Sequence, residues 1–393
     1  MRLIACMLAS ALVVITLTVA DARAQQLASR IDEYMNAAVG QGKFSGSVLV
    51  ARDGEVVFSK GYGMASLELG VPNTPQTKFR VGSLTKQFTA MAVMILQERG
   101  KLKVHDPVCN FIPDCPRAWA GVTIHHLLTH TSGIPDLVSF PDFQQTMALP
   151  SPVDKTVERF KTKPLEFEPG EKFKYSNSGY VLLGYIIERV TGQSYDAYLK
   201  ENIFGPLKML DTGNDRGDVL IKNRAAGYVR RGDVILNAPY IDMSIPTGGG
   251  SLYSTVGDLF LWDQALYAGK LINKNSYEAM FKPYATADWG DGAAYGWFIG
   301  ADKSGHRYMG FQGGINGFAA QIMRYPEQKV LLVILCNFSF APVGEIEQGL
   351  AAIVFGDRAR SSVGRAERLI HPDRSGVSGR RGRHLTYIHK TII

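Results

Sequence analysis

Ser83 and Lys86 are the residues whose types and spacing most directly suggest chemistry. They lie in the segment FRVGSLTKQF, residues 79–88. A serine hydroxyl is a weak nucleophile until a neighbouring base takes its proton, and a buried lysine with a lowered pKa can be that base. Residues three apart share a helix face, so the Lys86 amine can approach the Ser83 hydroxyl if a helix begins here. The spacing therefore predicts a serine nucleophile with a lysine base.

A helix that begins near Ser83 is the element that must position this pair. Apolar residues recur at the spacing of one helical face, and Gly100 is a suitable stop; the apolar positions are Leu84, Phe88, Met91 and Ile95. Free N–H groups and a partial positive charge at a helix N-terminus favour a developing oxyanion. The alternative is that Ser83 only caps the helix and that Lys86 is solvated on its first turn.

Tyr175 and Asn177 supply a second set of polar groups. They follow a Pro-Gly turn and precede an apolar run from Tyr180 to Val190, which we expect to be a buried helix. The pair is therefore predicted to lie on a loop. A second Tyr-x-Asn pattern, Tyr34 with Asn36, lies on a predicted first helix without a preceding turn, and we treat it as a coincidental match.

Strand patterns occur near both ends of the chain, with mostly helical patterns between them. The predicted strands are Gly46–Ala51, Glu55–Lys60, Tyr295–Gly300, His306–Phe311, Gly317–Arg324 and Lys329–Asn337, and Glu345–Phe355 is a predicted closing helix. We expect an α+β fold in which both chain ends form one antiparallel sheet flanked by helices. A mostly helical region, at about residues 84–245, is inserted into it.

Histidines and cysteines were considered as metal ligands. His125, His126 and His130 cluster, but no carboxylate or cysteine joins them at ligand spacing, so we favour cap and turn positions. Cys109 and Cys115 flank a short loop in which a disulfide is permitted but not required. Cys336 lies in an apolar run and is expected to be a buried thiol. We predict no metal site.

A glycine-rich stretch at residues 247–255 was considered as a phosphate loop. It lacks the following Lys-Ser/Thr, and we instead expect Ser254 or Thr255 to cap a helix. The sequence contains no G-x-S-x-G elbow, no H-E-x-x-H pair, no Walker loop and no dinucleotide fingerprint. We therefore predict no cofactor.

The chain begins with the features of a secretory signal peptide, predicted over residues 1–24: a charged start, an apolar core and an A-x-A site. We expect a periplasmic or secreted protein without stable membrane insertion, whose folded domain spans 25–356. Of the formal net charge of +7, residues 357–393 carry +6 and residues 1–24 carry +1, so the body is neutral. The basic tail has the composition of a disordered segment, and we expect no nucleic-acid binding.

Three motifs in order give the chain a family resemblance: Ser83-x-x-Lys86, Tyr175-x-Asn177 and a glycine-rich turn at residues 311–318 between two late strands. This arrangement resembles the serine β-lactamase and penicillin-binding-protein superfamily. The likeness is to its class C-like, β-lactamase-related hydrolases, which include D-alanyl-D-alanine carboxypeptidases, family VIII esterases and D-aminopeptidases. Segments 126–134 and 167–180 look like hallmark stretches of that group, and the likeness runs from Phe44 to Phe355.

The resemblance implies a role for each motif residue. Ser83 would be the acylated nucleophile. Lys86 and Tyr175 would share the proton transfers, with Lys86 keeping Tyr175 poised as an anion or strong acceptor. Asn177 would orient Lys86 and the substrate amide. The backbone N–H groups of Ser83 and Gly314, in the Gly313-Gly314 turn, would form the oxyanion hole. It also implies an antiparallel sheet beside an all-helical region, with the active site in the cleft.

One position departs from the family pattern. Phe311 stands where the third motif usually has a Lys or His, although Arg230 or Arg231 could replace that cation. An aromatic residue there suits a neutral substrate better than one with a free carboxylate. We expect hydrolysis of small ester or amide substrates, with esterase favoured and D-alanyl-D-alanine carboxypeptidase or β-lactamase as alternatives. A non-catalytic binder of cell-wall peptides is the alternative of another class.

Overall fold

The computed structural model describes residues 24–356, so all but the last residue of the predicted signal peptide (residues 1–24) and the whole basic tail (residues 357–393) lie outside the described residues. Its centre is one antiparallel sheet with the order β10-β11-β12-β13-β14-β15-β1-β2. The strands are β1 (Gly46–Arg52), β2 (Glu55–Tyr62), β10 (Ala285–Thr286), β11 (Gly292–Ala293), β12 (Phe298–Ala301), β13 (Arg307–Ile315), β14 (Phe318–Tyr325) and β15 (Val330–Cys336). Because β1 pairs with β15, both chain ends build this sheet, as predicted.

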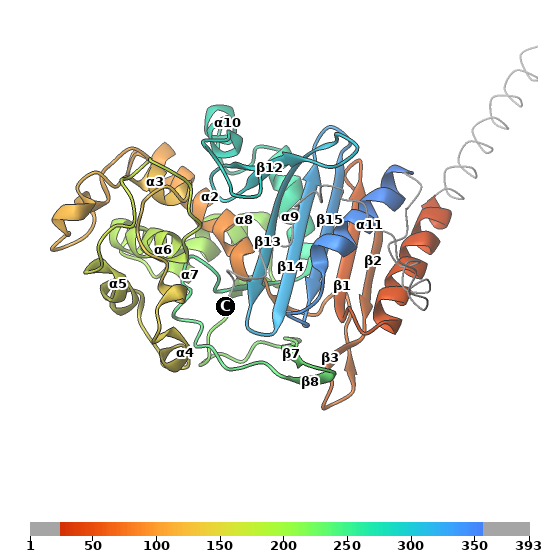
Figure 1. The fold of residues 1–393 in the computed structure, drawn as a ribbon. Coiled ribbons are helices and arrows are strands. Elements are labelled where there is room, and N and C mark those ends of the chain that lie inside the picture. The colour runs from red at the N-terminus through yellow and green to blue at the C-terminus, as the bar shows by residue number, and fades with distance from the viewer. Residues whose placement is uncertain (1–23, 357–393) are drawn as a thin grey trace, which may run out of the picture.

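Helices cover the sheet and form a separate group beside β12 and β13 (Figure 1). In addition to a helix over residues 24–40, they are α2 (Thr85–Glu98), α3 (Ile124–Leu128), α4 (Phe143–Thr146), α5 (Val153–Lys161), α6 (Asn177–Thr191), α7 (Tyr195–Leu199), α8 (Gly205–Leu207), α9 (Val256–Tyr267), α10 (Lys274–Phe281) and α11 (Val343–Phe355). In the part of the chain that the structure describes, no helix combines the length and hydropathy needed to span a bilayer.

Among the described residues, seven short strands lie outside the central sheet, and three of them interrupt the predicted helical region at about residues 84–245, which the sequence pattern had not indicated. They pair in three small sheets, β3 (Met64–Ser66) with β4 (Val71–Pro72), β5 (Phe79–Arg80) with β9 (Leu252–Ser254) and β6 (Gly213–Asn214), and β7 (Tyr228–Arg231) with β8 (Val234–Asn237). The β5–β9 pair brings the segment before Ser83 against the glycine-rich stretch at residues 247–255. This contact places the end of that stretch at the site.

Alternate residues of the central strands enter two hydrophobic cores, one on each face of the sheet. In β15, Val333 belongs to the core shared with α2 and α9, whereas Ile334 belongs to the core shared with α11 and the helix over residues 24–40. Side chains point alternately to opposite faces of a strand. Since helices cover both faces, β15 is apolar at every position. Cys336 is a buried free thiol, as predicted.

Two turns explain where the strand predictions were right and where they were displaced. Asp53 and Gly54 both have positive φ, 54° and 80°, which is the geometry of a tight two-residue hairpin turn between β1 and β2. The predicted strand from Tyr295 begins only at Phe298, because Gly296 has φ of 75° and interrupts the extended chain.

A close backbone approach joins β13 to η1 (Gly82–Leu84), the 3₁₀ turn that carries the serine. A Cβ atom on Gly313 would lie 2.0 Å from the Val81 carbonyl oxygen, and one on Gly82 would lie 2.5 Å from the Gly314 carbonyl oxygen. Gly82 also has φ of 51°, a region that glycine adopts at little cost. Only glycines at 82 and 313 allow the sheet to pack this closely against Ser83.

Candidate active site

Ser83 lies in the middle of η1, directly before α2, close to the predicted helix start. The prediction of one apolar face on α2 was too narrow, since every residue from Thr85 to Leu96 is buried. The helix passes between the sheet and the helical group, and neighbours therefore contact it on all sides (Figure 1). Lys86 is fully buried, which excludes the alternative of a solvated lysine.

The Lys86 ammonium nitrogen has three polar neighbours, and their chemistry limits its role. Nζ lies 3.1 Å from Ser83 Oγ, 2.9 Å from Asn177 Oδ1 and 2.7 Å from the Gly249 carbonyl oxygen. Both carbonyl oxygens can only accept, so they occupy two N–H groups of a neutral amine. The remaining lone pair then points to the hydroxyl of Ser83.

Burial lowers the pKa of Lys86 to about 7, although the buried carboxyl of Asp136 acts in the opposite direction. Removal from water disfavours the charged form of any group, which lowers the pKa of an amine and raises that of an acid. Accordingly, burial raises the pKa of Asp136 to about 6 against the opposing effect of Lys86. A substantial fraction of Lys86 is thus unprotonated near neutral pH.

Tyr175 donates its hydroxyl proton to Ser83 Oγ at 2.8 Å. Burial raises the pKa of Tyr175 well above its ordinary value, so the phenol is neutral at physiological pH. The resemblance implied instead a tyrosine that is an anion or a strong acceptor. The buried environment favours the neutral form of both groups, so the lysine amine offers a lone pair and the phenol offers a proton to donate.

The His130 ring stacks on Tyr175, with ring centroids 4.4 Å apart. Burial and the charge of Lys86 hold the pKa of His130 well below its usual range, so the imidazole is neutral. Its Nδ1 accepts the backbone N–H of Ser176 at 3.2 Å. His130 therefore fixes the backbone next to Tyr175 as well as the position of the phenol ring.

Asn177 is the first residue of α6, not a loop residue as predicted. Ser176 has extended backbone and its hydroxyl accepts the N–H of Gly179, so the helix begins three residues before the predicted Tyr180. Asp136 accepts from Asn177 twice, from the backbone N–H and from Nδ2, both at 3.1 Å. Asn177 is thereby held between Asp136 and Lys86.

Sequence reasoning missed three contributors to this arrangement: His130, Asp136 and the carbonyl of Gly249. The segment from His126 to Ile134 was singled out, but none of its residues received a role at the site. A signal for Asp136 was available, because an acidic residue directly after Ile-Pro is well suited to cap a following turn. No side-chain pattern could have indicated Gly249, which contributes only a backbone oxygen.

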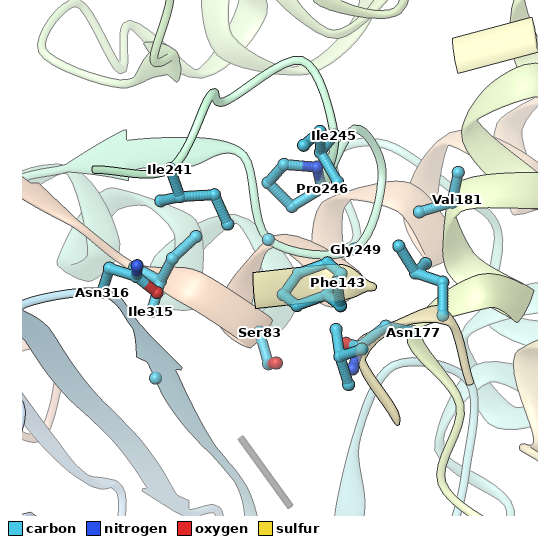
Figure 2. A pocket seen from close by; sticks show the side chains of 14 residues that line it. Ser83, Phe143, Asn177, Val181, Ile241, Ile245, Pro246, Gly249, Ile315 and Asn316 are labelled. Atoms are coloured by element: carbon cyan, nitrogen blue, oxygen red, sulfur yellow. The ribbon is translucent and has the colours of Figure 1, made fainter. Parts of the chain in front are cut away.

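A cavity opens beside Ser83 (Figure 2). Its described lining is largely aliphatic and aromatic and carries no charged side chain: Ser83, Leu137, Val138, Phe143, Asn177, Val181, Ile241, Ile245, Pro246, Gly249, Gly250, Gly314, Ile315 and Asn316. Gly314 lines the cavity, whereas Gly313 faces the Val81 backbone. The predicted pair of glycines thus divides into one residue beside the cavity and one that permits close packing.

Phe311 is buried in an aromatic cluster next to the site. Its ring centroid lies 5.0 Å from that of Phe298 and 6.5 Å from that of Tyr175. The suggestion that Arg230 supplies a cation here is wrong, because its guanidinium stacks on Phe340 and donates to the Gly42 carbonyl oxygen. Arg231 likewise is absent from the cavity lining described above. An apolar ring therefore occupies the place of the usual cation.

The remaining candidates have structural roles. His126 forms a capping box with Thr123 at the start of α3, and His125 Nδ1 lies 2.7 Å from the Tyr295 hydroxyl. Within residues 24–356 no group of three or more potential metal ligands is present. Cys109 and Cys115 form a disulfide, and Thr255 caps α9 by accepting the N–H of Asp258.

Tyr34 and Asn36, the coincidental match, lie far from Ser83 in the fold. They belong to the helix over residues 24–40, which contributes to the core on the opposite face of the sheet from α2. The Tyr34 hydroxyl donates to the Glu345 carbonyl oxygen at 3.4 Å, at the start of α11. The Tyr34-x-Asn36 pattern therefore does not contribute to the site around Ser83.

Comparisons with known proteins show similarity over most of the chain. The Beta-lactamase family model matches residues 27–353. Penicillin-binding protein 4* of Bacillus subtilis (strain 168) is 33% identical over 314 residues, which cover 75% of this chain and 68% of that protein. A second protein of that organism, PbpX, is named for penicillin binding; the match spans 63% of this chain and 61% of PbpX, at 36% identity.

Solved structures show the same likeness. The octameric penicillin-binding protein homologue from Pyrococcus abyssi superposes with a TM-score of 0.76 at 32% identity, covering 84% of this chain and 77% of that one. The D-amino acid amidase from Ochrobactrum anthropi SV3, in complex with L-phenylalanine amide, gives a TM-score of 0.74 at 25% identity, covering 85% and 100%. The chain therefore belongs to the β-lactamase family, within the serine β-lactamase and penicillin-binding-protein superfamily of serine hydrolases.

Proposed function

We propose that this protein hydrolyses esters of small, neutral, apolar acids through an acyl-enzyme on Ser83. The observation that carries the proposal is the set of contacts at Lys86, where two carbonyl oxygens accept from the amine and Ser83 Oγ takes the third position. In this arrangement a neutral amine has one lone pair, and it is directed at the proton to be removed.

The proposed reaction has two halves. Lys86 takes the proton of Ser83 while Oγ attacks the ester carbonyl, and the tetrahedral intermediate collapses to an acyl-serine. The departing alkoxide takes a proton from Tyr175, and the Lys86 ammonium returns one to the phenolate, so the base is neutral again. Water then attacks the acyl-serine while Lys86 accepts a proton of the water. When the second tetrahedral intermediate collapses, the Lys86 ammonium returns that proton to Ser83 Oγ and the carboxylic acid is released.

In the tetrahedral intermediate the substrate carbonyl oxygen becomes negatively charged, and backbone N–H groups at the N-terminus of a helix can stabilise that charge. The backbone N–H groups of Ser83 and Gly314 are the proposed donors, since both residues line the cavity and β13 packs directly on η1. Loss of one such donor commonly costs about two to three orders of magnitude in kcat. Gly313 acts in this proposal by allowing the close approach, without contacting substrate.

The uncharged cavity supports esters of neutral acids over the alternatives. A substrate carboxylate, as in a cell-wall peptide or a penicillin, would enter without a cation in the described lining, and Phe311 is apolar. A free ammonium, as on an amino acid amide, would enter without a carboxylate. Burying an unpaired charge is strongly unfavourable. Amide hydrolysis remains the second candidate for neutral amides, in view of the similarity to an amidase.

This proposal predicts a large preference between two esters of similar size. We expect kcat/KM for p-nitrophenyl butyrate to exceed that for mono-p-nitrophenyl succinate by about 100-fold or more, because only the second carries a charge into the apolar cavity. The rate of each ester in the same buffer without enzyme is subtracted, because the succinate carboxylate can attack its own ester carbonyl. Equal values, or a preference for the succinate, would reject the neutral-acyl proposal while leaving the serine mechanism intact.

We also propose that residues 25–356 form the catalytic domain of an exported protein, with the tail 357–393 outside it. The support is the signal-like sequence at residues 1–24 and the similarity to penicillin-binding proteins. The expected outcome is that N-terminal sequencing of protein purified from the native host begins at Gln25. Recovery of intact Met1 from the native host would contradict export by cleavage.

A further inference from the structure

We propose that Asp136 is a positioning residue of the active site, which fixes the direction of the Asn177 amide and supplies the counter-charge for the Lys86 ammonium. The inference rests on the proposed function, because it assigns Lys86 the role of base. Its geometric basis is that Asp136 is only 6% exposed and that the two shortest hydrogen bonds to its carboxylate both come from Asn177. No other carboxylate faces this part of the site in the described chain.

The direction of the Asn177 amide follows from what Asp136 can accept. An ionised carboxylate offers only acceptors, so its Oδ2 requires the Nδ2 end of the Asn177 amide, at 3.1 Å. The other end, Oδ1, is then turned to Lys86 Nζ at 2.9 Å. If the amide were reversed, its N–H group would face the amine and compete with Ser83 for the lone pair. By fixing the orientation of the Asn177 amide, Asp136 indirectly directs the Lys86 lone pair toward Ser83.

Charges and titratable groups around Lys86 come from several elements, and Asp136 is the one that is anionic at neutral pH. The rings of Tyr175 and Tyr180 lie under Nζ, with centroids 4.9 Å and 5.5 Å away, and both phenols have raised pKa values because they are buried. His130 is neutral, since burial and Lys86 lower its pKa. Asp136 thus opposes the effect of burial on the pKa of Lys86.

A purely structural role for Asp136 is the competing explanation, and one substitution separates the two. Asp136 caps the turn η4 (Leu137–Ser139), where its Oδ1 accepts the Val138 N–H. Asparagine is as good a cap as aspartate. Asp136→Asn therefore keeps the cap but removes the charge and one acceptor. The NH₂ group of the new asparagine would then face the NH₂ group of Asn177, and the Asn177 side-chain amide is expected to rotate so that its oxygen and nitrogen exchange places.

The test is the pH profile of kcat/KM for p-nitrophenyl butyrate in Asp136→Asn. Without the counter-charge the pKa of Lys86 falls, so the acidic limb is expected to move to lower pH by about one unit. The plateau rate is expected to fall by about 10- to 100-fold, because the lone pair is no longer aimed at Ser83. An acidic limb that stays in place, or moves to higher pH, would overturn the inference.

Two matched variants control for other effects. Asp142→Asn removes an exposed carboxylate near the same segment, which pairs with Arg159 at 3.2 Å, and should retain the wild-type profile. In an Asn177→Ala background, Asp136→Asn should cause little further loss of plateau rate, since the orientation acts through Asn177. A full additional loss in that background would show that Asp136 does not act through the amide.

A readout without turnover separates this inference from the proposed function. The pKa of Lys86 can be followed by NMR of ¹³C-labelled lysine, with Lys86→Met for assignment. A lowered Lys86 pKa in Asp136→Asn supports the counter-charge role even if no ester is hydrolysed, in which case only the proposed function fails. If esters are hydrolysed but the Lys86 pKa is the same in both proteins, the counter-charge role is refuted and the proposed function stands.

Discussion

Replacing Ser83 with alanine is expected to reduce hydrolysis of p-nitrophenyl butyrate by about four to six orders of magnitude. The hydroxyl is the only protein group of the proposed mechanism that forms a bond to the acyl carbon, so neither Lys86 nor Tyr175 can replace it. The same substitution should abolish covalent labelling by a fluorophosphonate, with the label on the wild-type protein located at Ser83 by mass spectrometry. Ser59→Ala, at an exposed position on β2, serves as the matched control with wild-type rate.

The fold should tolerate this change. The Ser83 hydroxyl contacts only Lys86 Nζ and the Tyr175 hydroxyl among the described polar side chains and fills little space, so the midpoint of thermal unfolding is expected to stay within about 4 °C of wild type. Unchanged turnover in Ser83→Ala would reject the site. A wild-type protein that labels at Ser83 with a single burst and no turnover would instead support the non-catalytic peptide binder, with deacylation blocked.

The second large effect is expected at Lys86. Arginine carries a permanent charge and has no lone pair near neutral pH, so Lys86→Arg should lower kcat/KM by about 10³-fold or more. Methionine, which is similar in length and uncharged, should cause a loss of the same order, because the base is absent in both variants. Lys155→Arg, on the exposed face of α5, is the matched control for a lysine-to-arginine substitution and should leave kcat/KM unchanged.

The pH dependence of the wild-type enzyme follows from the same residue. Lys86 acts as a base only when unprotonated, and burial lowers its pKa to about 7. Consequently kcat/KM should rise with pH through about 7 and level off above it, and this limb should be missing from the residual activity of Lys86→Arg and Lys86→Met. If Tyr175 were the base, Tyr175→Phe would cause a larger loss than Lys86→Met and the limb would lie far above neutrality, contrary to this expectation.

Some features of the fold could be predicted because they depend on local sequence. The turn at Asp53 and Gly54 follows from two residues that accept positive φ, and the strands of the sheet follow from apolar runs bounded by turns. The start of α2 and the capping of α9 by Thr255 are likewise local. The start of α6 was placed too late, because the capping role of Ser176 was not recognised.

The sequence by itself determined that Ser83 and Lys86, the proposed nucleophile and base, form a pair, because they lie one helical turn apart and meet in any helix that begins there. The tertiary structure alone decided how that pair works. Asn177 and Gly249, which accept from Lys86, are 91 and 163 residues away from it in the chain. Burial sets the charge of Lys86 and Tyr175, and burial depends on the packing of α2 between the sheet and the helical group. No local pattern contains that information, so neither the contact of Asp136 with Asn177 nor the neutral cavity could be assigned before the elements were brought together.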